Sequence, residues 1–389
     1  SKEALKSQKS PESMGTTVRK ALVVFQFTVS TVMMTGTLIL FLQTDYIKSK
    51  NLGFSKDQVV DNKIYGEFRD YLRQNWQTFE AKLTENTTIT SAALASNMPG
   101  DRLSVESVTP VTADADQEFP SVRVMRVDQH YLETMGIKVE QGRNFNANDT
   151  TAFILNRQAV ESLNLENAVG TKVANQSRDI QGEIVGTIDN FHFSSLHEEV
   201  EPLVLSYRPG WASRLVIRLE GKNTESALAQ VEEEIREVSP ETLFDYEFLD
   251  SRLESMYKTE FNTGKVVNLF SLLAIFISGM GLFGLITYTT EVRTKEIGIR
   301  KALGASGLKI ASILTLDFTK LTLISTIIAV PVSYYLAQQW LNRFAFKMEL
   351  TWWIFAIVGL ATLLFTLVTI SFQTIKAAMT NPVNALKAE

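Results

Sequence analysis

The sequence predicts a membrane protein with four transmembrane α-helices and a large α/β (α+β) domain inserted between the first and the second helix. Four long stretches carry no charged residue, and about 20 apolar residues are enough to cross the hydrocarbon core of a bilayer as a helix. The charge is also unevenly divided. Residues 45–265 hold 23 Lys and Arg against 36 Asp and Glu, whereas the rest of the chain holds 15 against 7. The two parts therefore face different surroundings.

The first apolar stretch, residues 21–44, is predicted to be a membrane anchor that stays in the protein. It is too long for the apolar region of a secretory signal, and no small-residue cleavage site follows it. Buried helices of a soluble protein would not explain four stretches of this length. The membrane part is therefore predicted as a cytoplasmic segment over 1–20, spans over 21–44, 266–290, 310–340 and 351–375, a loop over 291–309, a short loop over 341–350, and a tail over 376–389.

The positions of Lys and Arg near the span ends predict the orientation. These residues gather before the first span, between the second and third, and after the fourth, and such short basic segments stay in the cytoplasm. The loop over 341–350 holds only two basic residues and is flanked by Tyr and Trp, which favour the membrane interface. We therefore expect a multi-pass membrane protein with both termini in the cytoplasm, and with the loop over 341–350 and the large domain on the outer side of the membrane.

Residues 45–265 are predicted to fold as an extracytoplasmic domain around a hydrophobic core, because the chain has no cysteine and so no disulfides. Helical spacing from Phe68 to Leu83 and from Leu228 to Val238 predicts two helices, each between two strands. The two β-α-β halves, about 57–103 and 208–250, suggest a split βαβ, porter-like subdomain. Residues 104–207 look like an inserted, mostly β subdomain, and 250–265 like a stalk helix that runs into the second span.

The segment from Glu291 to Ser306, EVRTKEIGIRKALGAS, is a charged interruption between two spans. Acid-before-base pairs four residues apart, such as Glu296 and Arg300, favour a short surface helix, and Gly304 supplies a stop. On spacing alone, a bland basic loop and a helix that binds a partner are equally good interpretations.

Several motifs resemble those of one known family. They are EIGIRKALGAS between two spans, RKALVVFQFTVS at the first span, LGFSKDQVV after it, YLETMGIKVEQGRNF, EIVGTIDNFHFSSLHEEVEPLVL, FDYEFLDSRLESMY and the final NPVNALKAE. Together they cover nearly the whole chain. The chain resembles the FtsX-like and MacB-like permeases of ABC transporters, in particular the C-terminal half of the duplicated permeases common in Bacteroidetes-type bacteria. The opening SKEALK echoes NPVNALK, so we expect a half-length piece of a longer polypeptide.

The resemblance implies a multi-pass protein of the bacterial inner (plasma) membrane, with its large domain in the periplasm. It also implies that the charged loop docks on a separate cytoplasmic ATPase. That ATPase would bind ATP and Mg, and this chain would hold no cofactor or metal. The other implied partners are a second permease unit, periplasmic or outer-membrane proteins, and the lipid bilayer, but not nucleic acid. The residues implied in ATPase coupling are Glu291, Arg293, Lys295, Glu296, Ile297, Gly298, Ile299, Arg300, Lys301, Leu303 and Gly304.

Two further signals in the spans are interpreted as structural. Gly279, Gly281 and Gly284 spell GxGxxG, but they lie inside the second span with no strand before them, so helix packing explains them better than a dinucleotide site. Pro331 is expected to kink the third span.

His192 and His197, in the inserted domain, match no strong metal-ligand spacing.

The residues also bear on the function class. The sequence contains no GxxxxGK[ST] phosphate loop and no set of residues typical of a hydrolase, so we expect no enzyme activity in this chain. A mechanotransmission permease that extrudes a peptide, drug or lipoprotein-like substrate is the preferred hypothesis. The alternatives are an FtsX-like transmitter that regulates a periplasmic partner such as a cell-wall hydrolase, and a membrane-anchored sensor. The sequence does not choose the substrate.

Overall fold

The protein folds as two units, which are seen in a computed structural model that describes residues 11–50, 52–85, 87–113, 117–194, 198–221, 223–292 and 307–378. The membrane unit comprises residues 1–48 and 259–389, and the domain comprises residues 49–258.

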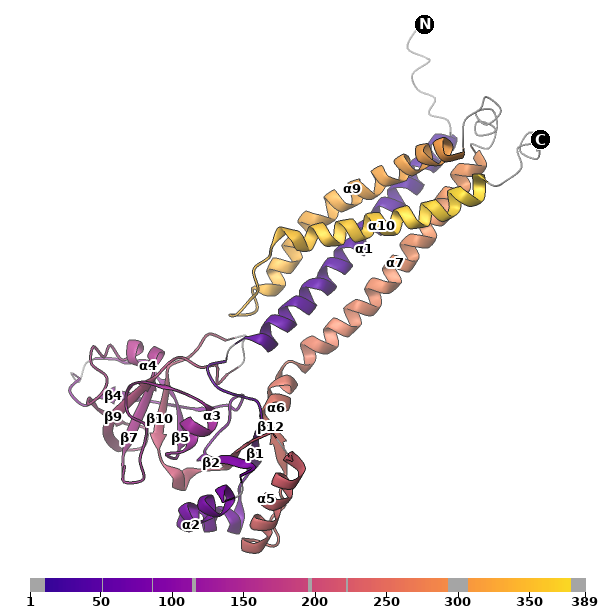
Figure 1. Ribbon diagram of the computed structural model, residues 1–389. Helices are drawn as coiled ribbons and strands as arrows, with labels where there is room; N and C mark the ends of the chain where they lie inside the picture. The colour runs from indigo at the N-terminus through magenta and orange to yellow at the C-terminus, as the bar shows by residue number, and fades with distance from the viewer. Residues whose placement is uncertain are drawn as a thin grey trace. The chain divides into compact units, whose positions relative to one another are not determined.

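Four long helices make up the described part of the membrane unit (Figure 1). They are α1 (Pro11–Ser49), α7 (Lys258–Val292), α9 (Gly307–Leu341) and α10 (Trp352–Ala378). Each contains a stretch long and apolar enough to cross a membrane, and these stretches are Thr17–Ile47, Asn262–Val292, Thr315–Leu341 and Trp352–Ser371. The prediction of four spans around an inserted domain is confirmed.

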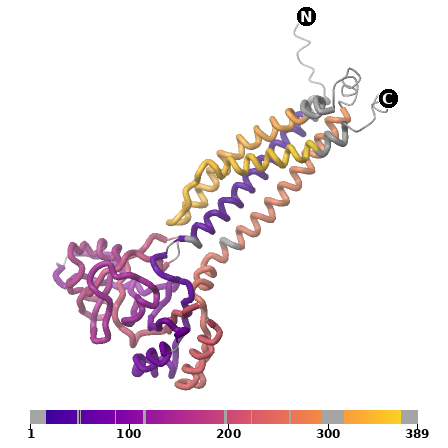
Figure 2. The backbone as a smooth tube through the Cα atoms, in the orientation of Figure 1, coloured from indigo at the N-terminus to yellow at the C-terminus, as the bar shows by residue number. Residues whose placement is uncertain are grey.

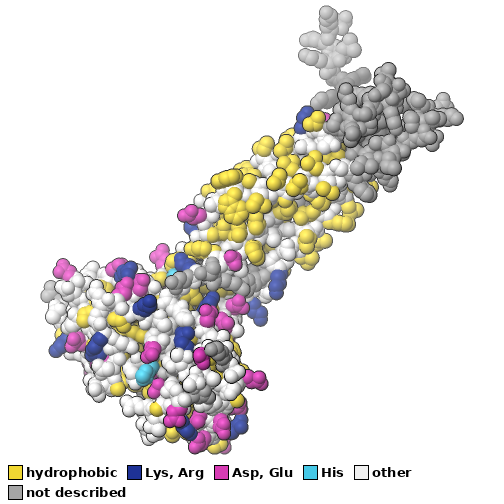
Figure 3. All heavy atoms as spheres, in the orientation of Figure 1, with side chains coloured by type: hydrophobic (Ala, Val, Ile, Leu, Met, Phe, Trp, Pro, Cys, Tyr) yellow, Lys and Arg dark blue, Asp and Glu magenta, His cyan; other side chains and the backbone are white. Residues whose placement is uncertain are grey.

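The outward faces of these helices are apolar. Phe276 on α7, Ile327 on α9 and Val368 on α10 each leave well over half of their surface exposed. Figure 3 shows apolar side chains over this unit and mixed charged side chains over the domain. Such a surface suits lipid, because in a bilayer the apolar side chains need no cover from the rest of the protein.

The described strands of the domain form one twelve-stranded sheet. Its order is β12-β1-β11-β2-β5-β10-β7-β9-β8-β4, with β3 also paired to β5 and β6 to β9. The strands are β1 (Val59–Lys63), β2 (Ile89–Ala95), β3 (Ser104–Glu106), β4 (Val108–Pro110), β5 (Val122–Val127), β6 (Val139–Gly142), β7 (Ala152–Asn156), β8 (Lys172–Asn175), β9 (Ile180–Ile188), β10 (Leu203–Tyr207), β11 (Arg214–Leu219) and β12 (Tyr246–Phe248).

The first half of the sheet is the predicted split βαβ subdomain. Its strands lie in the order β12-β1-β11-β2 and are all antiparallel, with β11 between β1 and β2. Helix α2 (Gly66–Thr84) connects β1 to β2, and helix α5 (Thr224–Val238) connects β11 to β12. This is the connectivity expected when two β-α-β halves share one sheet.

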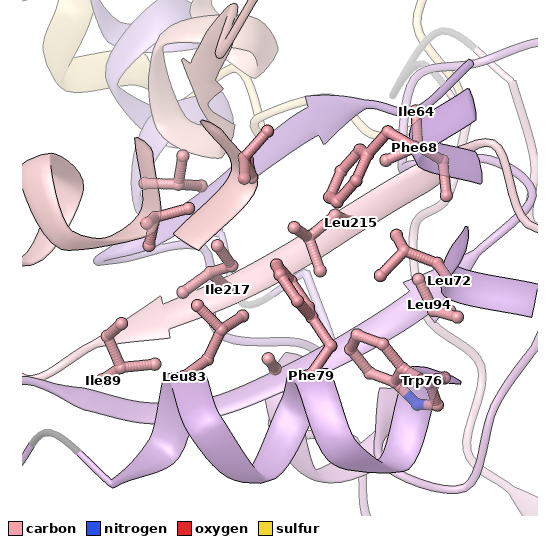
Figure 4. Packing of buried hydrophobic residues seen from close by; sticks show 14 of the residues in the cluster. Ile64, Phe68, Leu72, Trp76, Phe79, Leu83, Ile89, Leu94, Leu215 and Ile217 are labelled. Atoms are coloured by element: carbon pink, nitrogen blue, oxygen red, sulfur yellow. The ribbon is translucent and has the colours of Figure 1, made fainter. Parts of the chain in front are cut away.

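A hydrophobic core joins α2 and α5 to one face of this half (Figure 4). Buried residues recur every three or four positions along α2, which places them on one side of the helix. These residues contact Leu94 of β2 and Leu215 and Ile217 of β11. The buried residues of α2 are Phe68, Leu72, Trp76, Phe79 and Leu83. The predicted helical spacing is confirmed.

The second half of the sheet has its own core. It packs residues of β5, β7, β9 and β10 against helix α4 (Arg157–Ser162), with Phe153 and Leu155 buried at its centre. Strands β5 and β10 are parallel, as are β7 and β9. This half corresponds to the predicted mostly β insertion. However, it extends the same sheet, because Ala95 of β2 pairs with Val127 of β5.

The expected stalk helix over 250–265 is not one helix in the structure. Helix α6 (Leu249–Met256) ends first, Tyr257 lies outside the helical conformation at φ −103° and ψ 14°, and α7 starts at Lys258. The segment contains no Gly or Pro before Gly264 that would have predicted this break. A role for the segment as a stalk stays a prediction.

Candidate functional site

Most of the predicted ATPase-coupling residues lie outside the described residues. Glu291 is described; it is exposed in the last turn of α7. The others, Arg293, Lys295, Glu296, Ile297, Gly298, Ile299, Arg300, Lys301, Leu303 and Gly304, lie in the undescribed stretch between α7 and α9. The helices at the two ends of this stretch, α7 and α9, therefore form the described part of the candidate site.

A buried apolar cluster joins the helices on both sides of that stretch. Leu282, Leu285 and Ile286 come from the end of α7, and Phe318 comes from α9. The same cluster contains Val23 and Phe27 of α1 and Ile370 of α10. Because all four helices contribute buried side chains to one cluster, a displacement of α7 or α9 at this end meets the side chains of the other helices.

The seam between α1 and α7 carries paired hydroxyl groups. Ser30 Oγ lies 2.8 Å from Ser278 Oγ, and Thr37 Oγ1 lies 2.8 Å from Ser271 Oγ. The two pairs are seven residues apart on each helix, as expected for two antiparallel helices that keep the same faces together. Small hydroxyl residues let membrane helices approach closely and bond to each other.

Hydroxyl groups also connect the other helices. Thr322 of α9 and Thr366 of α10 lie 3.1 Å apart between their oxygens, and Thr31 of α1 lies 3.4 Å from Thr362 of α10. Among the described residues of the four helices, the buried polar side chains are hydroxyls and the amide of Gln43. Sequence reasoning missed these pairs, although the spacing of seven between Ser30 and Thr37, and between Ser271 and Ser278, is visible in the chain.

Two cavities lie beside α7 toward its start. One of about 620 Å³ is bounded by α1, α7 and α10, and its lining includes Thr37, Ser271 and Ala361. The other, of about 240 Å³, is bounded by α1, α7 and α9, and its lining includes Val267 and Ala337. In this stretch α7 bonds to α1 and borders an open cavity toward α10 and another toward α9.

The predicted packing glycines have different surroundings. A Cβ atom added at Gly279 would lie 3.0 Å from Phe365 Cζ of α10, and one at Gly281 would lie 2.3 Å from Gln26 Oε1 of α1. One at Gly284 would meet nothing within 4 Å. Pro331 lies inside α9, where it removes a helix hydrogen bond. A role of these residues in function stays a prediction.

Two buried acids stand out in the domain, and sequence reasoning missed both. Asp128 is fully buried, and its Oδ1 accepts a hydrogen bond of 3.1 Å from the His130 backbone N–H. Burial raises the pKa of Asp128 to about 7. Burial also opposes the charge of Glu106, but hydrogen bonds from Asn175 and Arg126 outweigh it and hold the pKa of Glu106 below its usual value. Only the fold places these partners.

The two histidines noted in the sequence do not form a metal site in the described part of the chain. Burial lowers the pKa of His192, and His197 lies outside the described residues. No group of three or more His, Cys, Asp or Glu within metal-binding reach occurs among the residues that the structure describes.

The comparison with protein families identifies the membrane unit. Residues 268–382, which run from α7 to beyond α10, match the family described as FtsX-like permease C-terminal. This part of the chain belongs to the FtsX-like permease family. The match includes the stretch between α7 and α9, so the predicted coupling residues lie inside the family region. With its four spans, this FtsX-like permease is a multi-pass membrane protein with an extracytoplasmic domain.

A curated relative of this FtsX-like permease is the uncharacterized ABC transporter permease YknZ of Bacillus subtilis (strain 168). The two are 21% identical over 236 residues, which cover 56% of this chain. The aligned part covers 58% of the length of that relative.

Solved structures resemble the domain of this FtsX-like permease. The periplasmic region of MacB from Actinobacillus actinomycetemcomitans is 13% identical, with a TM-score of 0.38, and the match covers 54% of this chain and 97% of that one. The extracellular domain of YknZ from Gram-positive bacteria is 12% identical, with a TM-score of 0.34 and coverages of 49% and 97%. A domain of a putative permease from Porphyromonas gingivalis is 10% identical, with a TM-score of 0.35 and coverages of 50% and 89%.

Proposed function

We propose that this chain is the membrane permease subunit of an ABC transporter of the mechanotransmission type. In this proposal a separate cytoplasmic ATPase binds the segment 291–309 and moves it. The four helices pass the motion to the domain, and the domain acts on a substrate or partner outside the cytoplasm. The chain itself performs no chemistry.

One observation carries the proposal: the buried cluster that joins the ends of α7 and α9 to α1 and α10. The segment 291–309 connects α7 to α9, so any force on it reaches both helices directly. The cluster gives that force a close-packed route to α1, and α1 and α7 are the two helices that lead in sequence into the domain.

The cavities beside α7 support a moving helix. Because α7 bonds to α1 through the Ser30–Ser278 and Thr37–Ser271 pairs, the two can shift together. The open cavities toward α9 and α10 leave fewer protein contacts at this end of α7 that would resist such a shift.

The composition of the bundle supports a mechanical role over a passage for cargo. Among the described residues, the buried polar groups between the helices are uncharged. Proton-coupled or ion-coupled carriers place ionisable residues at this depth. We therefore propose that cargo is handled by the domain, and that an extruded peptide, drug or lipoprotein-like molecule does not pass between these helices.

The test uses charge reversal in the full chain, reconstituted with its ATPase. Glu296→Lys and Arg300→Glu are each expected to lower the stimulation of ATP hydrolysis by the permease at least threefold, with expression unchanged. The matched control is Lys347→Glu in the loop between α9 and α10, which carries the same size of charge change on the other side of the bundle. Undiminished stimulation of ATP hydrolysis in both Glu296→Lys and Arg300→Glu would overturn the coupling role.

A further inference from the structure

Four charged side chains of the domain meet on the face of the sheet opposite to the α2–α5 core. Val60 of β1 points into that core, so its neighbour Asp61 points to the other face. Asp61 pairs in register with Val216, and Arg214 lies two residues away on β11, which makes Asp61 and Arg214 diagonal neighbours on one face. Their side chains bond at 2.6 Å between Arg214 Nη1 and Asp61 Oδ2.

Two more residues complete this charge cluster. Asp101, in the loop after β2, accepts a hydrogen bond of 3.0 Å from Arg214 Nη2 on its Oδ2. Arg252 of α6 donates from Nη2 to Asp101 Oδ1, and its Nη1 lies 3.8 Å from Asp61 Oδ2. The cluster of Asp61, Arg214, Asp101 and Arg252 therefore alternates acid and base. Glu247 of β12 adds a partner for Arg252 at 3.1 Å.

The cluster lies largely out of solvent. The exposed fractions of the four side chains are 1% for Asp61, 11% for Arg214, 18% for Asp101 and 14% for Arg252. Ion pairs at this depth are held in one geometry, because a charge that loses its partner there is left without water. An exposed pair such as Arg236 and Glu232 on α5 has no such restraint.

The positions of these residues along the chain suggest what the cluster does. Asp61 lies on β1, which is the first strand after α1, and Arg252 lies on α6, which is the last helix before α7. The two ends of the domain that continue into membrane helices are thus joined by charges from β1, β11, α6 and the loop after β2. Apolar contacts of α6 add to this, since Leu249 is fully buried and Met256 lies against Gly100.

We propose that the charge cluster of Asp61, Arg214, Asp101 and Arg252 fixes α6 against β1, so that the entry and the exit of the domain move as one body. The use of this rigidity in transmitting motion rests on the function proposed above. Arg252 is the positioning residue, because it alone in the cluster belongs to α6.

The proposal can be tested without the ATPase. The chain has no native cysteine, so Lys63→Cys on β1 and Ser255→Cys on α6 carry two unique spin labels on the full-length protein in nanodiscs. Both positions are exposed. Electron paramagnetic resonance is expected to give a narrow distance distribution, which becomes at least twice as wide with Arg252→Gln. Arg252→Lys keeps the charge but loses the two-pronged donor, and should fall between the two.

Arg236→Gln removes an exposed charge and is the matched control, with an unchanged width expected. The double variant Asp101→Asn with Arg252→Gln removes one acid and one base, and it leaves the Asp61–Arg214 pair intact should the single variant fail to fold. A narrow distribution in either folded variant would overturn the proposal. Arg252→Gln could widen the distance distribution as expected and still leave the stimulation of ATP hydrolysis unchanged. In that case the cluster restrains α6, and its use in coupling is refuted.

Discussion

Gln43 of α1 and Met348 of the loop between α9 and α10 are joined across 305 positions of sequence by a hydrogen bond of 2.8 Å, from the Met348 backbone N–H to Gln43 Oε1. The Gln43 amide also donates to the carbonyl oxygen of Phe346 at 2.9 Å. One buried side chain therefore satisfies two backbone groups of the loop. It ties that loop to α1 at the end of the bundle opposite to the segment 291–309.

Gln43→Leu should destabilise the bundle on the order of 2 kcal/mol, because it leaves two backbone groups without partners. We expect a lower thermal unfolding temperature in detergent and faster proteolysis within residues 341–350. Gln339→Leu, at an exposed position where the amide donates to Tyr335 Oη, is the control. Equal unfolding temperatures for the two variants would contradict this role of Gln43.

Gly279→Ile should destabilise the packing of α7 on α10 by roughly 1–3 kcal/mol, since overfilling a packed contact costs about this much. The added side chain would collide with the ring of Phe365. Gly284→Ile, the same change five residues along the same helix, meets open space and should be tolerated. The measurement is the thermal unfolding temperature of both variants. A larger loss at Gly284 than at Gly279 would be incompatible with the structure.

Asp128 should make the domain less stable as pH rises from about 4 to about 7. Its folded pKa of about 7 lies above the ordinary value of 3.8, so the folded protein binds an extra proton in this window and gains stability from it at the acid end. Asp128→Asn should flatten that slope and unfold at a higher temperature than the wild type at pH 8. Tryptophan fluorescence during heating at several pH values measures this.

Asp149→Asn is the control for the pH experiment, because its effect has the opposite sign. A hydrogen bond from Arg143 lowers the pKa of Asp149, so its contribution is present above the ordinary pKa and is lost as pH falls below that value. An unaltered slope between pH 4 and 7 in Asp128→Asn would show that another group titrates in this window.

The orientation can be tested with single cysteines in the otherwise cysteine-free chain. Glu233→Cys, at an exposed position on α5, should react with an impermeant maleimide added to intact spheroplasts. Ser306→Cys, in the segment between α7 and α9, should react only after the membrane is opened. The reverse pattern of labelling would invert the topology.

Local patterns predicted much of the fold because their causes are local. The apolar spacing of Phe68, Leu72 and Trp76 is a property of one helix, and the run AFILN gives β7 its bounds. The membrane spans follow from length and lack of charge in the same way. None of these features needs a partner far along the chain.

The rest of the structure depends on pairings that no local pattern contains. Arg252 contacts Asp101 across 151 positions of sequence, and Gln43 contacts Met348 across 305. From the sequence alone, both Arg252 and Gln43 would be assigned to a solvent-exposed face. The single sheet was missed because its two halves join at one residue pair, Ala95 with Val127. The coupling role of Glu291 and of the residues that follow it stays a prediction from resemblance.

The two cavities beside α7 give the bundle a mechanical property of its own. Both cavities open to the surroundings of the helices, so in a bilayer lipid chains fill them. A shift of α7 during a working cycle changes their volumes of about 620 Å³ and 240 Å³, and it displaces or admits lipid as it does so. The lateral packing of the surrounding lipid would then act on the turnover of the assembly without touching any binding site.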